Sequence, residues 1–478
     1  MPAIKSRTTS ATVWTVAGFG ASQGLRLAGN LVLARLLIPE DFGTMALIAI
    51  LMQGLVMFSD VGIGPSIIRS ARGNDPDFLN TAWTIQAARG LALWICACAL
   101  AIPFAGFYNE PKFEILVPVA CLNVFILGFI STALFTENRA LNLGRITSIE
   151  VVSQIAGLTV MVSWAFAAPT VWALIAGGIV SSTAKMLLSH LMFPSKRNCF
   201  RWDRSAVSEL VKFGKWIFLS TALGFTSGQI DRIVLGKLVP LDLLGLYSIA
   251  FMWANAPYQL TLAWSSKVFF PLASKAILTG VDTEKDRLMA YRKDLLLIAA
   301  PLIAGLIIAM PKLIKLLYLP TFEEAGPVGS ILAVGVWVGM LSSTYGAINM
   351  AGGKPHYISI AAGAKVVLFI SLVIPFYGSW GVLGVAAAVI VSQAGPYIVS
   401  ATGVFRSGFS SIVHDLSFSA ILIAVSYLVF ALNRYAEKTY HSLIIDLVVI
   451  CGISGAISAI FFAIIWIKSL RRKSPSGA

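Results

Sequence analysis

The chain has 478 residues, of which 57% are hydrophobic and only 12% are charged, and its formal net charge is +14. A soluble domain keeps about 25% charged residues, so the composition excludes a soluble globular protein and indicates an integral membrane protein. A membrane β-barrel is not expected either, because the sequence lacks its strands of about ten residues with alternating hydrophobicity.

Apolar stretches follow one another along the whole chain. A helix needs about 20 apolar residues to cross the hydrocarbon, and we count about fourteen stretches of that length. They begin near Thr12, Phe42, Asn80, Phe113, Ser148, Thr170, Phe213, Leu243, Tyr291, Val328, Tyr357, Gly381, Ile412 and Ser442. The sequence therefore predicts an all-α polytopic membrane protein with short connections and no soluble domain.

The basic residues gather on alternate connections between the predicted helices. One side holds Lys5, Arg7, Arg69, Arg72, Arg139, Arg145, Lys196, Arg197, Arg201, Arg204, Lys275, Lys285, Arg287, Arg292, Lys293, Arg406 and the tail from Lys468 to Lys473. The other side holds only a scatter, such as Lys112, Lys312, Lys315, Arg434 and Lys438. Because basic connections stay in the cytoplasm, both termini are predicted to be cytoplasmic. Topology thus explains most of the net charge, and a nucleic-acid partner is not expected.

A hydrophilic connection from Pro194 to Trp216 divides six predicted helices from eight. Its second part, from Ser205, has the mixed spacing of an interfacial helix that feeds the seventh span. The predicted organisation is an N-lobe with helices 1 to 6 (1–193), a cytoplasmic linker (194–212), a C-lobe with helices 7 to 12 (213–404), and two further helices with a basic tail (405–478).

A short internal repeat relates the two lobes. The stretch NLVLARLLIPEDFG, which begins at Asn30, aligns with DRIVLGKLVPLDLLG, which begins at Asp231. One inserted residue then brings Gly43 opposite Gly245. Six spans separate the copies, so both run in the same direction, as in a parallel repeat about an axis normal to the membrane. Such repeats place a central cavity between two lobes, with helices one and seven facing each other.

Charged residues inside the predicted spans are the candidates for function, because a charge at the bilayer centre costs roughly 2.5–3.5 kcal/mol. In the first helix, Arg26 shares a face with Thr15, Ser22, Gly29 and Leu33, and Asn30 lies beside them. In the seventh, Asp231 shares a face with Ser220, Gly224 and Ser227. Arg89, Lys185 and Lys365 add cations in the third, sixth and eleventh spans.

This set is mostly cationic, and Asp231 is the clearest acid well inside a span. If all the cations formed structural ion pairs, more buried acids would be expected, so the excess predicts an anionic guest. The fork of an arginine suits phosphate oxygens. We predict substrate contacts at Arg26, Asn30, Arg89, Lys185 and Lys365, with snorkelling or pairing as the alternative for Arg89 and Lys185. Asp231 either holds a coupling cation or proton or neutralises a neighbouring arginine.

Other patterns carry less information about function. Gly20 and Gly24 have the small-xxx-small spacing that predicts close helix contact. The four histidines are scattered over different spans and loops, and the five cysteines show neither metal nor redox spacing. The sequence therefore predicts neither a catalytic constellation nor a metal site.

The residues now described resemble the polysaccharide-transporter (Wzx-type) flippases, in the superfamily that also contains multidrug extrusion proteins and the lipid II flippase. The resemblance is carried, in order along nearly the whole chain, by LARLLIPEDFGTMALIAI, FSDVGIGPSIIR, GQIDRIVLGKL, LYLPTFEEAGPVGSILAV, NMAGGKP and YGSWGVLGVAAAV. Where the lipid II flippase has an Arg-Asp pair in the first helix, this chain has Asn30 and Leu31, a departure that argues against lipid II as cargo.

The resemblance implies two six-helix lobes, two additional C-terminal helices and a cationic cavity that opens alternately to either side. The implied cargo is an undecaprenyl-pyrophosphate-linked oligosaccharide, moved from the cytoplasmic to the periplasmic leaflet of the bacterial inner membrane. No cofactor is implied beyond H⁺ or Na⁺ coupling, and the expected partners are the lipid bilayer, a polysaccharide polymerase and a chain-length regulator. A cation-coupled multidrug antiporter of the same superfamily and a membrane polysaccharide polymerase or ligase remain as alternatives.

Overall fold

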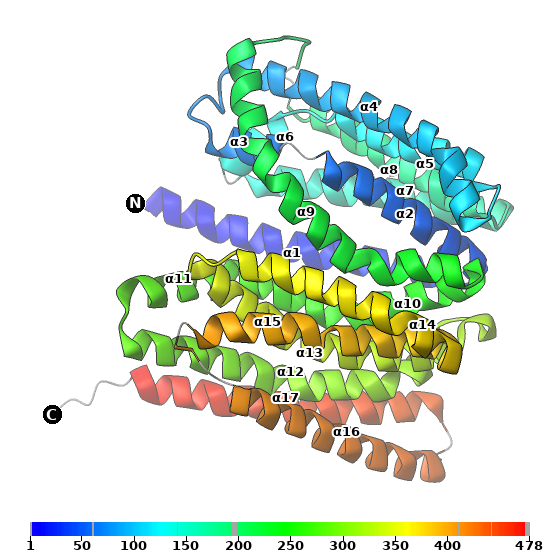
Figure 1. Ribbon diagram of the computed structural model, residues 1–478, viewed down its shortest axis with the longest axis vertical. Helices are drawn as coiled ribbons and strands as arrows, with labels where there is room; N and C mark the ends of the chain where they lie inside the picture. Colours follow the sequence, from blue (N-terminus) through cyan, green and yellow to red (C-terminus); the bar gives the residue numbers. More distant parts are fainter. Residues whose placement is uncertain are drawn as a thin grey trace. The chain divides into compact units, whose positions relative to one another are not determined.

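The computed structural model describes residues 2–59, 62–140, 142–193, 198–406, 408–409, 412–440 and 442–473. The described residues form helices and no strand (Figure 1), which confirms the all-α prediction. Within them, nine helices are long and apolar enough to cross a membrane, or ten if one bent pair of helices forms a single span. The protein is a multi-pass membrane protein.

The first half of the chain contains α1 (Pro2–Leu33), α2 (Pro39–Phe58), α3 (Ile63–Arg69), α4 (Pro76–Tyr108), α5 (Phe113–Gly128), α6 (Ala133–Arg139), α7 (Leu143–Ala167) and α8 (Val171–Leu191). The chain then continues with α9 (Arg204–Leu238), α10 (Leu241–Trp264), η1 (Ser265–Phe269), α11 (Phe270–Thr279), α12 (Asp282–Leu317), η2 (Pro320–Phe322), α13 (Ala325–Ala351), α14 (His356–Ser392), α15 (Ala394–Phe405), α16 (Ile412–Tyr440) and α17 (Leu443–Lys473). Helix α14 has a non-helical residue at Gly381, where a separate span is predicted to begin. If α14 is divided there and α3, α6, α11 and α15 continue their preceding helices, the elements are consistent with about fourteen spans.

Contacts divide the chain into two compact units. Unit 1 is Met1–Phe225 with Arg232–Gly245, and unit 2 is Thr226–Asp231 with Leu246–Ala478. The segment predicted as an interfacial helix from Ser205 forms the first part of α9, which continues into the seventh span without a break.

Several helices begin where the sequence supplies a cap. Pro39 starts α2, with Glu40 and Asp41 in the first turn, where carboxylates favour the positive end of the helix dipole. Asp75 caps α4 by accepting a hydrogen bond from the Asp77 amide, and Asp203 caps α9 by accepting one from Ser205.

The described part of the linker lies along α4. The amide groups of Cys199, Arg201 and Asp203 donate to side-chain oxygens of Asn80, Thr84 and Thr81 at 3.0–3.1 Å. This arrangement satisfies backbone donors of an extended segment that has no neighbouring strand.

In unit 1, α1 packs against α7 at two glycines. A Cβ on Gly18 would overlap Thr147, and one on Gly29 would lie 2.5 Å from the Leu158 Cδ1 atom. A Cβ on Gly20 or Gly24 would meet no described atom within 4 Å. The prediction that Gly20 and Gly24 mark a close helix contact is therefore wrong. The contact uses the other glycines because only they lie on the face turned toward α7.

The repeated glycines meet each other in unit 1. A Cβ on Gly43 would overlap the carbonyl oxygen of Leu241, and one on Gly245 would overlap that of Pro39. The two copies of the repeat thus cross at their first turns, and each glycine leaves room for the other copy's backbone. This reciprocity is the pattern that a two-fold repeat produces.

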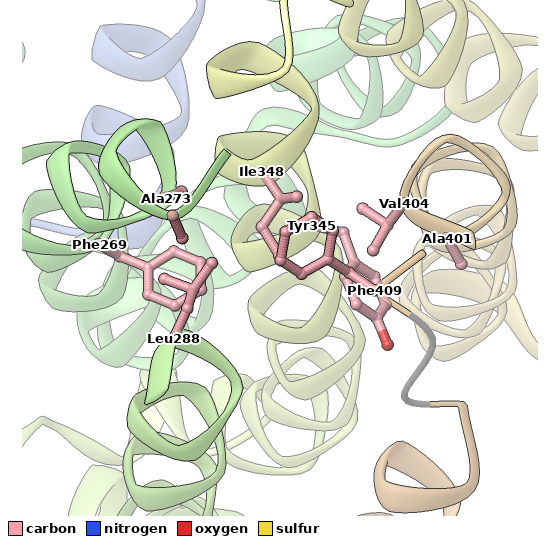
Figure 2. Packing of buried hydrophobic residues seen from close by; sticks show 9 residues of the cluster. Phe269, Ala273, Leu288, Tyr345, Ile348, Ala401, Val404 and Phe409 are labelled. Atoms are coloured by element: carbon pink, nitrogen blue, oxygen red, sulfur yellow. The ribbon is translucent and has the colours of Figure 1, made fainter. Parts of the chain in front are cut away.

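In unit 2, a core cluster joins η1 and α11 to α12, α13 and α15. Figure 2 shows Phe269, Ala273 and Leu288 on one side of the central Tyr345, with Ala401 and Val404 on the other. Helices α16 and α17 lie beside α12 (Figure 1) and complete the unit.

Candidate functional site

Arg26 lies on α1, and its side chain is exposed. It makes no hydrogen bond, ion pair or aromatic contact with any residue that the structure describes. Gln23 and Asn30, one turn to either side, are half-buried and lie at similar angles around the helix. Arg26 is therefore a cation that unit 1 leaves unneutralised, within a short polar edge of α1.

The rest of the predicted face on α1 has a different role. Gly29 and Leu33 are buried, and Leu33 packs in a cluster with Ala165 and Leu174. Those positions face α7 and the core of unit 1. The face of α1 that we expected to line a central cavity therefore packs in part against other helices. Arg26 stands at the edge of that packed face. The side chain of Thr15 lies outside the described set.

The Arg89 side chain binds the C-terminal end of α2. Its Nε donates to the Ser59 Oγ at 2.9 Å, and its Nη2 donates to the Val56 carbonyl at 2.6 Å. Carbonyl groups at the end of a helix lack intrahelical partners and favour a cation. The structure thus places Arg89 in a structural role at this helix end.

Lys185 pairs with Glu150 on α7, with 3.5 Å between Nζ and Oε1. Both side chains are substantially exposed, at 33% and 50%, so this ion pair is loose and worth little on its own. The contact of Lys185 with its partner is longer than either contact of Arg89.

Lys365 of α14 contacts α9 at Ser227, one turn away from Asp231, and all three residues belong to unit 2. The Lys365 ammonium donates to the Ser227 carbonyl at 2.7 Å, and Ser227 lies one helical turn before Asp231. The Asp231 side chain is 3% exposed. Its Oδ2 accepts a hydrogen bond from the Tyr247 hydroxyl at 2.5 Å, whereas its buried Oδ1 has no hydrogen-bond partner among the described residues. Ser220, predicted on the same face, lies outside the described side chains.

A buried ion pair that the sequence analysis missed joins α12 to α16. Arg292 is 0% exposed, and its guanidinium meets both oxygens of Asp415, at 2.5 and 3.2 Å. The hydroxyls of Tyr345 and Tyr397 also donate to Asp415, at 2.5 and 2.9 Å. The assignment of Arg292 to a cytoplasmic loop is therefore wrong. The helix extends further toward the chain start than hydropathy indicated, and Asp415 supplies the charge that makes burial possible.

A second cation of α12 is neutralised in the same way. Lys312 is 14% exposed, and its ammonium lies 2.6 Å from carboxylate oxygens of both Asp446 and Glu437. It also donates to the Asn433 amide oxygen at 2.9 Å. The expectation that few acids are buried beside the cations is wrong for unit 2. The signal that was overlooked is Asp415 and Asp446, each in the first turn of an apolar stretch.

Helix α10 is rich in polar residues for a helix of its length. It has 24 residues, yet it is not among the helices apolar enough to pass as a span by composition. Asn255, Tyr258 and Gln259 lie in its second half, and Gln259 is exposed. Polar residues on a helix inside a membrane normally face protein or water rather than lipid. No group of three or more His, Cys, Asp or Glu side chains within the described residues is placed to hold a metal ion.

Comparisons with known proteins identify the family of the chain. The family model described as "Polysaccharide biosynthesis protein" matches residues 32–327. The chain is 23% identical over 396 residues to the lipopolysaccharide biosynthesis protein WzxC of Escherichia coli K12, covering 82% of this chain and 79% of that protein.

Solved structures share the fold. One is the lipid II flippase MurJ in an inward closed conformation, with a TM-score of 0.74, 14% identity, and coverage of 96% of this chain and 100% of that one. Another is an inward-facing multidrug resistance MATE transporter, with a TM-score of 0.61, 13% identity, and coverage of 85% and 96%. The chain shares the fold of these solved structures, and it belongs to the polysaccharide biosynthesis protein family.

Proposed function

We propose that this protein is a flippase that moves an oligosaccharide linked to undecaprenyl pyrophosphate from the cytoplasmic to the periplasmic leaflet of a bacterial inner membrane. The observation that carries the proposal is Arg26, an exposed arginine inside a predicted span with no described partner. Such a residue is costly in a membrane unless it faces water or a ligand.

The chemistry of the cargo fits an arginine at this place. A pyrophosphate cannot cross hydrocarbon without replacement of its hydration. The guanidinium offers a planar pair of donors to phosphate oxygens and keeps its charge at any physiological pH. The polyprenyl tail would remain in the bilayer while the charged head passes along a wet interior. The polar composition of α10 supports such an interior.

The other predicted contacts rank behind Arg26. Arg89 would have to leave the end of α2, whereas Lys185 is held only by a loose ion pair. Lys365 donates a hydrogen bond to the Ser227 carbonyl, and Asn30 lies one turn beyond Arg26. We therefore assign the primary phosphate contact to Arg26, with Lys185 and Lys365 as secondary contacts.

Asp231 is the candidate for energy coupling. Its buried Oδ1 has no hydrogen-bond partner in the part of the chain that the structure describes, and such an oxygen is satisfied when it takes up a proton or a monovalent cation. The Asp231→Asn variant is expected to transport without dependence on a proton or sodium gradient, or not at all. Transport by that variant with unchanged gradient dependence would remove Asp231 from the coupling role.

The experiment that tests the function compares Arg26→Ala with Arg35→Ala in cells. Arg35 is a matched control, because it is also exposed, lies two residues beyond the end of α1, and its side chain has no described partner. The Arg26 variant is expected to lower surface polymer at least about tenfold and to accumulate cytoplasm-facing lipid-linked units, since a charged hydrogen bond is worth about 1.5–3 kcal/mol. Normal polymer without accumulation in the Arg26 variant would contradict the proposal.

Two other functions would give different results. A multidrug antiporter would lower the cellular content of cationic dyes when expressed, and an unneutralised arginine does not favour cationic cargo. A polymerase or ligase would lengthen or transfer the glycan of a radiolabelled lipid-linked substrate. A flippase is expected to relocate that substrate with its glycan unchanged and to work beside a separate polymerase and chain-length regulator. Both termini are proposed to lie in the cytoplasm.

A further inference from the structure

Helix α10 continues into α11 through a π-helical turn, η1, at Ser265–Phe269. A π-turn inserts one extra residue into a helix, and such turns are rare and occur frequently at functional sites. The proposed function does not involve this turn. The burial and contacts of its residues show which side chains are available to a ligand.

One edge of η1 is fixed in the core of unit 2. Phe269 is fully buried among Ala273, Leu288 and Tyr345 (Figure 2), and the Trp264 ring stacks on it with 5.3 Å between ring centroids. Ser265, at the start of the turn, is buried as well. The other residues of the turn lie on the opposite edge.

That opposite edge is exposed and carries a cation. Ser266, Lys267 and Val268 are all exposed, and Lys267 makes no hydrogen bond, ion pair or aromatic contact with any described residue. Nearby lysines are neutralised by acids of their own: Lys275 pairs with Glu284 at 3.2 Å, and Lys285 pairs with Asp282 at 2.9 Å. The turn thus holds a rigidly mounted, unneutralised cation.

The depth of Lys267 follows from helix length. Helix α10 begins at Leu241, and with 1.5 Å of rise per residue Lys267 stands about 39 Å further along. The hydrocarbon is about 30 Å thick. In the proposed orientation, with Leu241 at the periplasmic side, Lys267 lies at the level of the cytoplasmic headgroups.

We propose that the exposed edge of η1 is a binding site for a phosphate-bearing lipid headgroup at the cytoplasmic surface, with Lys267 as the contacting charge. This inference rests on the proposed function and its orientation, and it gives the cargo diphosphate a first contact before Arg26. Two lipids carry the same chemistry at this level: the polyprenyl diphosphate of the cargo and a bulk anionic phospholipid such as phosphatidylglycerol.

The test measures binding of geranylgeranyl diphosphate to the purified full chain in detergent, and of phosphatidylglycerol in nanodiscs, with and without Lys267→Gln. Both are repeated in an Arg26→Ala background so that Arg26 does not mask the effect. Loss of Lys267 is expected to weaken binding of at least one lipid about tenfold, whereas Lys267→Arg retains it. A loss confined to the diphosphate identifies cargo, and a loss for both lipids identifies a general headgroup site.

Lys315→Gln is the matched control, because Lys315 is also an exposed lysine of unit 2 without a described partner. The inference is overturned if Lys267→Gln binds both lipids as the unaltered chain does, or if Lys315→Gln weakens binding as much. The proposed function is tested separately. If Arg26→Ala blocks transport while Lys267→Gln changes no binding, the headgroup site is contradicted and the proposed function is not. If Arg26→Ala transports normally, the proposed function is contradicted, whatever the binding result.

Discussion

The cations of α12 and the cation of α1 have opposite surroundings. Arg292 pairs with Asp415 of α16, and Lys312 pairs with Glu437 of α16 and Asp446 of α17. Arg26 is exposed and has no described partner. The comparison teaches that a charge inside a predicted span is not by itself a site. The charge that the protein leaves unneutralised is the one available to a ligand.

The positions of the two neutralised cations show what they do instead. Arg292 and Lys312 are separated by about 30 Å along α12, at 1.5 Å per residue. The two cations therefore hold α16 at two well-separated levels of α12, and Lys312 also holds α17. The C-terminal helices are attached to unit 2 by charge pairs as well as by apolar packing.

The largest expected effect is on Arg292. The Arg292→Ala variant leaves Asp415 buried with an uncompensated charge, which is expected to lower the free energy of unfolding by about 3–5 kcal/mol. Thermal unfolding of the purified protein measures it. The double variant Arg292→Met with Asp415→Leu is expected to recover most of the stability, because an apolar pair of similar size avoids the desolvation cost. An unchanged melting temperature for Arg292→Ala would show that the pair with Asp415 does not stabilise unit 2, and would contradict the distinction between neutralised and unneutralised cations.

A smaller effect is expected at the other end of α12. The Lys312→Ala variant removes charged hydrogen bonds to Asp446 and Asn433 and is expected to cost about 1–3 kcal/mol. Lys315→Ala is expected to stay within about 0.5 kcal/mol, because Lys315 is exposed. The same unfolding assay compares them, and an equal or reversed order would show that the acids around Lys312 do not stabilise unit 2.

Lys185 has an ion-pair partner, like the neutralised cations of α12, but its side chain is substantially exposed, as that of Arg26 is. A double-mutant cycle with Glu150 can show whether its role is structural or in cargo binding. The pair with Glu150 is expected to contribute only about 0–1 kcal/mol to stability. If Lys185 also contacts cargo, Lys185→Ala lowers transport whether or not Glu150 is replaced by Ala. Equal transport for the single variants, the double variant and the unaltered chain would place Lys185 with the structural cations.

The smallest effect concerns the linker. The hydrogen bond from Arg72, followed by those from Ser205, lowers the pKa of Asp203 from 3.8 to about 2. A carboxyl whose folded pKa is depressed stabilises the docked linker above its ordinary pKa, and the contribution is lost as the pH falls toward 2. A dye on Cys199, in a chain without other cysteines, reports release of the linker. Arg72→Gln is expected to raise the pH of release, and an unchanged release pH would show that Arg72 does not hold the linker.

The fold was largely predictable because hydropathy and basic connections depend on composition over tens of residues. The stretches that begin near Phe113 and Thr170 coincide with α5 and α8 almost to the residue. The weakest point was the start of α12, where charged residues precede the apolar run and obscure the helix. The same weakness placed Arg292 in a loop.

The site was predictable only in part, because neutralisation depends on partners far apart in sequence. Asp415 lies 123 residues from Arg292, and Asp446 lies 134 residues from Lys312. No local pattern links such residues. The helix-end role of Arg89 likewise depends on how α4 packs beside α2. Lys267 was missed because a π-turn has no sequence signature.

The most direct test of the central claim is the reactivity of a cysteine at position 26. In a chain without other cysteines, Arg26→Cys is expected to react with a charged, water-soluble thiol reagent and to be protected by geranylgeranyl diphosphate. Ile374→Cys, an exposed apolar position on α14, is the control that should react only with a lipid-soluble reagent. If the cysteine at position 26 behaves like this control, Arg26 faces lipid, and the account of a wet phosphate site is contradicted.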